Sequence, residues 1–172
     1  MRKTILTYGF LAGAILGGVM IASLPFMNGG LMGALIGYTT MVLAFLLVYF
    51  GVRSYRDNVA GGRITFGKAM LVGSAIALIG ICCYVATWEV IYFKVTPDFA
   101  EKYAAHQIDR MRAAGASEAM LAQKQKEMDA FAKAYHDPII NIAYTFLEPL
   151  PVALIMTLIS AGMVKRKEAL PA

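Results

Sequence analysis

The sequence predicts an all-α integral membrane protein, a four-helix bundle with an extramembrane helical hairpin between its third and fourth spans. Three observations support this fold class. The chain has 172 residues, of which 59% are hydrophobic and only 16% charged, a balance unlike that of an ordinary water-soluble domain. The charged residues are clustered, so that long stretches carry almost none. Crossing a hydrocarbon core takes about 20 apolar residues in a helix, and the sequence offers four such stretches.

The first two spans are predicted at about residues 4–24 and 31–52, because no charged residue lies between Thr4 and Val52. Two basic residues precede the first span, as they would in a secretory signal peptide. The apolar run is longer than such a signal needs, so we interpret it as a retained span. The segment between the two spans, residues 25–30, is rich in residues that break helices or tolerate a positive φ, which predicts a tight turn.

The third and fourth spans are predicted at about residues 68–93 and 139–164. Inside these boundaries each contains one charged residue, which is Glu89 in the third span and Glu148 in the fourth. Aromatic residues near the end of the third span favour a membrane interface. The fourth span contains a Pro-x-Pro sequence directly after its carboxylate, which predicts a kink or a local end of the helix.

The distribution of lysine and arginine predicts the topology. Two precede the first span, four lie between the second and third, three follow the fourth, and none lies in the first turn. The positive-inside rule then places both termini in the cytoplasm. Residues 94–137 carry seven basic and seven acidic residues, and we expect them to be periplasmic. The chain thus divides into three spans at 1–93, the hairpin at 94–137, and the fourth span with a basic cytoplasmic tail at 138–172.

The hairpin is predicted to consist of two short helices. Thr96 is the expected N-cap of the first, followed by a proline and an acid in its first turn. Gly115 and Ser117 resemble a C-cap followed by a new N-cap. Apolar residues recur at roughly helical spacing in both halves. We expect these apolar faces to pack on each other or on the bilayer surface.

Glycines form a stripe at four-residue intervals in each of the first two spans, Gly9, Gly13 and Gly17 in the first and Gly29, Gly33 and Gly37 in the second. Small residues let helix backbones approach closely in lipid, where dispersion contacts drive association. We predict that the stripes mediate helix packing, and we favour packing between these two spans over homodimerisation.

Glu148 and Glu89 are the candidate functional residues inside the membrane, because a carboxylate near the bilayer centre costs about 2.5 kcal/mol or more unless it is neutral, paired or hydrated. Glu89 lies close to Lys94, which also fits an interfacial carboxylate. Glu148 precedes Pro149 and Pro151, which remove two backbone donors. The freed carbonyls predict either a polar pocket or a structural role for a protonated Glu148 at the kink.

Other constellations of reactive residues point to no chemistry. Cys82 and Cys83 are adjacent and mid-span, where bridging is strained, so we expect packed thiols. His106 and His136 have acids nearby but no third metal ligand that we can identify. The sequence therefore predicts no catalytic residue, no metal and no cofactor. The formal charge of +5 lies beside the spans without an aromatic-interleaved patch, so no nucleic-acid partner is expected.

The loop after the second span is basic and glycine-containing. Its glycines 61 and 62 predict a turn, and Thr65 is a candidate cap of the third helix. The basic residues of this region are candidate contacts for lipid phosphates, namely Arg53, Arg56, Arg63 and Lys68.

The stretch RDNVAGGRITFGKA at residues 56–69 resembles the bacterial DUF4199 family of small membrane proteins. The glycine-rich opening, the four-span plan and the long third connection are similar to that family over the whole chain. This resemblance implies a bacterial inner-membrane location and points to no particular activity.

The sequence supports two functional hypotheses of different classes. The leading one is a non-enzymatic structural or interaction module that uses its outer hairpin to contact lipid, another membrane protein or a second copy of itself. The alternative is a small transporter or ion-coupled carrier that uses Glu148 with Glu89, and four spans would then have to form an oligomer.

Overall fold

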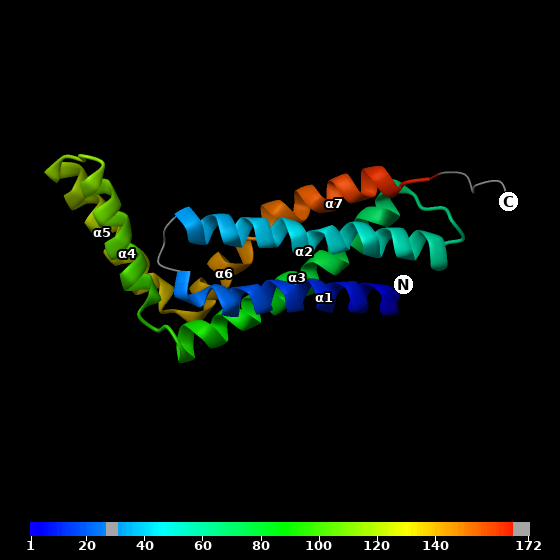
Figure 1. Ribbon diagram of the computed structural model, residues 1–172, viewed down its shortest axis with the longest axis horizontal. Coiled ribbons are helices and arrows are strands. Elements are labelled where there is room, and N and C mark those ends of the chain that lie inside the picture. The colour runs from blue at the N-terminus through cyan, green and yellow to red at the C-terminus, as the bar shows by residue number, and fades with distance from the viewer. Residues whose placement is uncertain (27–30, 167–172) are drawn as a thin grey trace.

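The computed structural model describes residues 1–26 and 31–166, and all its elements longer than a single bridge are helices. The predicted all-α fold class is confirmed. The helices, shown in Figure 1, are α1 (Arg2–Ser23), the short 3-10 helix η1 (Leu24–Phe26), α2 (Leu31–Asn58), α3 (Phe66–Lys94), α4 (Phe99–Ala113), α5 (Glu118–Tyr135), α6 (Pro138–Leu147) and α7 (Leu150–Val164). The predicted turn at 25–30 falls largely outside the described residues, as do Gly29 and Lys167.

Four helical segments are long and apolar enough to cross a membrane: α1, α2, α3, and α6 with α7 taken together as Pro138–Val164. They form a bundle in which α3 contacts α1, α2, α6 and α7, while α7 also packs on α2. The N-terminus and the C-terminal end of α7 lie at the same end of this bundle, and α4 and α5 lie at the other (Figure 1).

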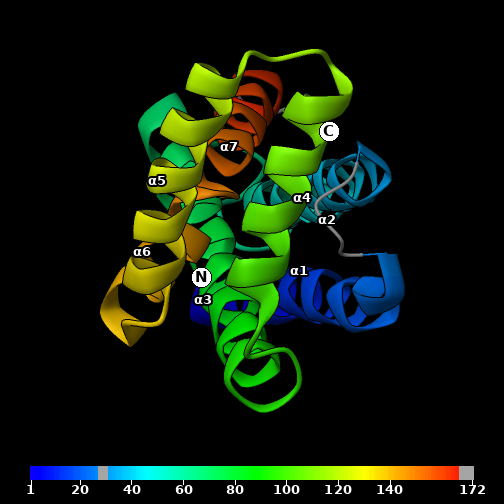
Figure 2. The same cartoon turned by 90° about the vertical axis from the view of Figure 1, so that its left-hand side faces the viewer.

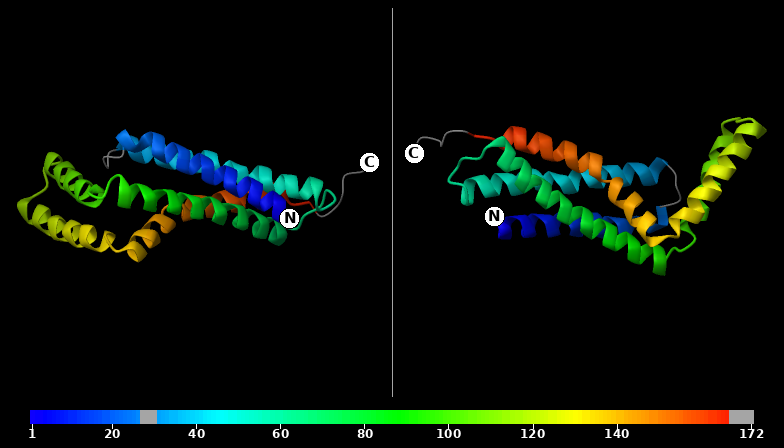
Figure 3. Two further views of the ribbon diagram at one scale, coloured as in Figure 1. Left: turned by 90° about the horizontal axis from the view of Figure 1, so that it is seen from below. Right: turned by 180° about the vertical axis from the view of Figure 1, so that it is seen from behind.

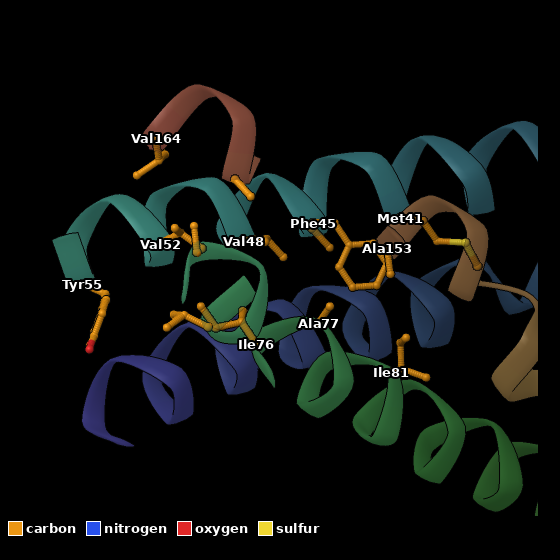
Figure 4. Packing of buried hydrophobic residues seen from close by; sticks show 14 of the residues in the cluster. Met41, Phe45, Val48, Val52, Tyr55, Ile76, Ala77, Ile81, Ala153 and Val164 are labelled. Carbon is orange, nitrogen blue, oxygen red and sulfur yellow. The ribbon is translucent and has the colours of Figure 1, made fainter. Parts of the chain in front are cut away.

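The bundle interior is apolar and tightly enclosed. Figure 4 shows side chains of α2 and α3 directed into the space between the helices, with α7 closing one side. The side chains of this interior that are almost fully buried include those of Leu16, Met41, Phe45, Val48, Val52, Ile76 and Val164. A single interior shared by all four spanning segments fixes their mutual positions.

The outer surface of the bundle is also apolar. Phe10 of α1 is 58% exposed, Leu43 of α2 is 56% exposed and Ile155 of α7 is 56% exposed. Large contiguous apolar surfaces of this kind are rare on proteins that face water. Hydrocarbon is the solvent that suits this surface.

The glycine stripe of α1 packs closely, but on α3 instead of α2. A Cβ added to Gly13 would lie 2.5 Å from Cys83 Cβ, and one added to Gly9 would lie 2.7 Å from Ile79 Cβ. Gly17 meets Thr87 in the same way. Helices α1 and α2 do pack on each other, as predicted, but their contact does not run through this stripe. A stripe of small residues shows which face can be approached closely and carries no information on which helix approaches it.

The predicted stripe of α2 makes no such contact at Gly37, where an added Cβ would meet nothing within 4 Å. Gly33 is half-buried. The close approach on α2 occurs instead at Gly51, whose added Cβ would lie 2.5 Å from Ile76 Cδ1. This position was not predicted, because Gly51 stands alone in the sequence, outside any glycine repeat.

The loop between α2 and α3 follows the sequence-based expectation. Gly61 and Gly62 have φ values of +64° and +77°, which glycine adopts without steric cost. Thr65 Oγ1 accepts a hydrogen bond from the Lys68 amide at 3.3 Å and so caps α3, as predicted. Backbone hydrogen bonds between Ile64 and Arg166 join this loop to the end of α7.

The hairpin turns where the sequence predicts. Gly115 has a φ of +78°, and Ser117 Oγ accepts a hydrogen bond from the Met120 amide at 3.4 Å. Thr96 is not the N-cap, because α4 begins later, after Asp98. The Thr96 hydroxyl instead donates to the carbonyl of Ile91 at 3.5 Å, in the last turn of α3.

The two hairpin helices lie side by side at the end of the bundle (Figure 2) and extend beyond it (Figure 3). The apolar faces predicted for them pack on each other, since Ile108 and Leu121 are each 6% exposed. Near the bundle, a second buried cluster combines α1, α3 and both hairpin helices, and it contains Met20, Trp88, Ile91, Tyr92, Ala100, Ala132 and Tyr135.

Candidate functional site

The candidate site lies where the fourth span breaks. Helix α6 ends at Leu147 and α7 begins at Leu150, so the local end predicted at the Pro-x-Pro sequence is confirmed. Pro149 is buried, and Pro151 is exposed. Because neither proline has an N–H, the carbonyls of Thr145 and Leu147 lose their helical donors. The break therefore leaves polar carbonyl groups without helical hydrogen bonds inside an apolar span.

Glu148 lies in this break and is exposed on the surface of the bundle. Its Oε2 accepts a hydrogen bond of 2.8 Å from the Tyr84 hydroxyl of α3. The residue before Tyr84 is Cys83, which meets Gly13 halfway along α1. The Glu148 and Tyr84 pair therefore lies near the middle of the spans, far from either end of the bundle.

A chain of polar side chains follows α6 from this break towards the hairpin. Thr145 Oγ1 donates to Asn141 Oδ1 at 3.3 Å, and Asn141 Nδ2 donates to the Tyr135 carbonyl at 3.2 Å. Asn141 is completely buried. The indole N–H of Trp88 donates to Tyr135 Oη at 3.0 Å. These bonds connect the fourth span, the third span and the base of the hairpin.

Tyr135 lies within electrostatic reach of both intramembrane carboxylates. Burial raises the pKa of its phenol, the hydrogen bond donated by Trp88 acts to lower it, and the charges of Glu148 and Glu89 act to raise it. Glu89 is half-buried, and its Oε1 is enclosed without a hydrogen-bond partner among the described residues. The two carboxylates predicted from the sequence thus both act on Tyr135, but no hydrogen bond among the described residues joins them.

His136 provides a further link between the hairpin base and α3. Tyr92 Oη and His136 Nδ1 share a hydrogen bond of 3.0 Å, and His136 Nε2 donates to Glu101 Oε1 at 2.6 Å. The bond from His136 lowers the pKa of the Glu101 carboxyl below its ordinary value. This link joins α3, α4 and the end of α5, and sequence reasoning missed it.

The acid next to His136 in the sequence has a different role. Asp137 Oδ1 accepts from the Ile139 amide at 2.8 Å and caps α6, with Pro138 in the first turn. The Asp-Pro dipeptide was a readable signal for this cap. No sequence pattern connects His136 with Glu101, because they lie on different helices.

Arg56 corrects the predicted set of lipid-phosphate contacts. It is only 6% exposed, and its Nη1 donates to the Val164 carbonyl at 3.1 Å, at the end of α7. Its Nε also donates to Asp57 at 2.6 Å. The predicted contact is wrong for Arg56 because its guanidinium caps a neighbouring helix. Arg53, Arg63 and Lys68 are exposed, and their contact with lipid phosphates stays a prediction.

The two histidines occupy separate places. His136 belongs to the hairpin base, whereas His106 lines an open cleft of about 440 Å³ between η1 and α4. On the same helix, Lys102 also lines this cleft and pairs with Asp98 at 2.7 Å. Over residues 1–26 and 31–166, no group of three His, Cys, Asp or Glu side chains is placed to hold a metal ion.

The four apolar helices, the apolar outer surface of the bundle and the polar residues gathered inside one span define a polytopic helical membrane protein. A family model described as "Protein of unknown function (DUF4199)" matches residues 7–166, so the chain belongs to this family. The resemblance found at residues 56–69 is thereby confirmed over nearly the whole chain. No curated protein and no solved structure matches the sequence.

Proposed function

We propose that this protein is a non-enzymatic module of a bacterial inner membrane that presents its α4–α5 hairpin on the periplasmic side as a docking element for another protein. The observation that supports this proposal is the hairpin itself. Its base is bonded to the spans, while its distal part extends beyond the bundle (Figure 3).

The base of the hairpin is suited to hold it in one orientation. Trp88 donates to Tyr135, and the ring of Phe99 packs edge-on against Trp88 with centroids 4.8 Å apart. The link through His136 fixes α4 to α3 as well. Such a base limits the conformational entropy that a partner would have to remove on binding.

The surface of the hairpin favours a protein partner over the bilayer. Among its large aliphatic and aromatic side chains at 99–135, Met120 is the exposed one, at 56%. An interfacial helix needs a broad apolar face or a basic surface. The hairpin has no broad apolar face, as the exposure of Met120 alone shows. It is also not basic overall, because the seven basic and seven acidic residues of 94–137 cancel. Mixed charges of this kind provide specificity between proteins.

A photo-reactive residue at Ala119, on the exposed tip, should give a protein adduct of one defined mass in living cells. The same residue at Ile155, on the outer surface of α7, should not give that adduct. Reversing an exposed tip charge with Arg112→Glu should reduce the adduct several-fold, because rim charges control association. Reversal at the exposed Lys133 near the base is the matched control. Adducts with lipid alone, or equal adducts from all variants, would contradict the proposal, and an adduct of twice the chain mass would identify a second copy as the partner.

The proposed topology is tested by accessibility of single cysteines in a background in which Cys82 and Cys83 are replaced by alanine. A membrane-impermeant thiol reagent added outside intact cells should label cysteines at Ala113 or Gln125 and miss one at Ala60. The basic residues beside Ala60 keep that loop inside. The reverse labelling pattern would overturn the topology.

An ion-coupled carrier is the second candidate, and the pairing of Glu148 with Tyr84 in mid-span favours it. Carboxylates at this depth commonly mark ion pathways. The four spans of one chain enclose an apolar interior, so a transport path would lie between copies. If Glu148→Gln and Glu89→Gln leave proton-coupled flux in reconstituted vesicles unchanged, this candidate loses its support.

A further inference from the structure

Glu148 combines three properties that are seldom found together in a membrane span. It lies in mid-span, it is exposed on the surface of the bundle, and its carboxylate accepts a hydrogen bond from Tyr84. A charged carboxylate facing hydrocarbon is costly, whereas the protonated acid is tolerated. The surrounding groups therefore decide whether the acid can release its proton.

The groups that face Glu148 come from two elements packed near α6. Tyr84 of α3 donates to it, and Tyr135 of α5 lies within electrostatic reach. Glu89 of α3 acts on the same Tyr135. Within the described part of the chain Glu148 forms no ion pair, and these neighbours carry no positive charge that would hold it permanently ionised.

Both protonation states of Glu148 have a hydrogen-bond partner in the same place. The ionised carboxylate accepts from the Tyr84 hydroxyl, a bond that offsets part of the cost of the charge. The protonated carboxyl can donate, and the prolines leave the carbonyls of Thr145 and Leu147 on the same turn without helical donors. Each protonation state of the carboxyl therefore has a hydrogen-bonding group of the required kind on the same turn or on the facing helix, as reversible proton exchange requires.

We propose that Glu148, held by Tyr84 at the α6–α7 break, is a reversible proton-binding site in the middle of the membrane that opens to the surface of the bundle. Tyr84 is the positioning residue, and the proton binds to the Glu148 carboxyl. The site does not depend on the proposed docking role of the hairpin. A carrier would need it, yet binding and transport are measured separately, so the site can exist without proton flux.

The test uses a hydrophobic carbodiimide, which reacts with protonated carboxyls inside membranes. The full-length protein in lipid nanodiscs is treated between pH 5 and pH 9, and modified residues are quantified by peptide mass spectrometry. Modification of Glu148 should persist at pH values where ordinary carboxyl groups are fully ionised, so its half-maximal pH should lie above theirs. Exposed acids such as Glu118 should stay unmodified because the reagent partitions into lipid.

Variants at Tyr84 provide the decisive comparison. Tyr84→Phe removes the bond that favours the ionised form, so the half-maximal pH should rise by about one unit. Tyr49→Phe, which removes a phenol from α2, should leave it unchanged. The proposal would be overturned if Glu148 were not modified at any pH, or if Tyr84→Phe left the half-maximal pH unchanged. Protection of Glu148 by sodium at constant pH would also overturn it, because it would show a metal-cation site instead.

Discussion

The Gly13→Leu variant is expected to lose the packing of α1 on α3 and to unfold at a much lower temperature than the natural protein. A Cβ at this position would already lie 2.5 Å from Cys83 Cβ and 2.7 Å from its Sγ, so a larger side chain must push the helices apart. Overpacking of a tight interior costs about 1–3 kcal/mol for small insertions, and leucine should reach at least the upper end of that range. Thermal unfolding of the detergent-purified protein measures the effect.

Two matched variants separate steric overlap from a general effect of substitution. Gly18→Leu lies on the exposed side of α1, where an added Cβ would meet nothing within 4 Å, and it should unfold like the natural protein. The double variant Gly13→Ala with Cys83→Gly should be more stable than Gly13→Ala alone. Without the cysteine side chain, the nearest remaining atom is Gly80 Cα at 3.8 Å. Equal stability of Gly13→Leu and Gly18→Leu would contradict the packing of α1 on α3.

The Glu148→Lys variant is expected to destabilise the bundle by about 2.5–3.5 kcal/mol, the usual cost of a charged side chain at the centre of a membrane helix. The substitution places an ammonium in mid-span and also removes the acceptor of the Tyr84 hydroxyl. The measurement is the free energy of unfolding in lipid-like micelles. Ala113→Lys, which adds the same charge to the exposed end of α4, should have little effect.

Glu148→Gln completes this comparison because glutamine keeps the shape and can still accept from Tyr84. We expect it to retain nearly the full stability of the natural protein. A large loss in Glu148→Gln would instead indicate an ionised carboxylate paired with a cation. Unchanged stability of Glu148→Lys would place this residue in water or at the membrane interface.

Local features of the fold were predictable because their causes are local. The helix break follows from two prolines separated by one residue, and the caps at Thr65 and Ser117 follow from hydroxyl groups placed at the start of helices. Helix length was less predictable. The charged residues after residue 52 continue α2 to Asn58, because a helix does not have to end where its apolar run ends.

The candidate site was only partly predictable. Glu148 and Glu89 stand out in the sequence because each interrupts an apolar span, and that signal needs no knowledge of neighbours. Tyr84 carries no such signal, because an aromatic residue does not interrupt an apolar span. Its hydrogen bond with Glu148 joins residues 64 positions apart. The partners of a predicted site residue depend on which helices pack together.

The sequence by itself determined the class of protein, the number of spanning segments, the hairpin between the third and fourth of them, and the two carboxylates inside the apolar spans. Each of these depends on composition and spacing along one segment. Only the tertiary structure decided that α1 packs on α3, that Arg56 caps α7 instead of facing lipid phosphates, and that His136 joins Glu101. The physical reason is that hydrocarbon accepts any apolar helix face, so pairing is decided by steric fit and by hydrogen bonds between distant segments.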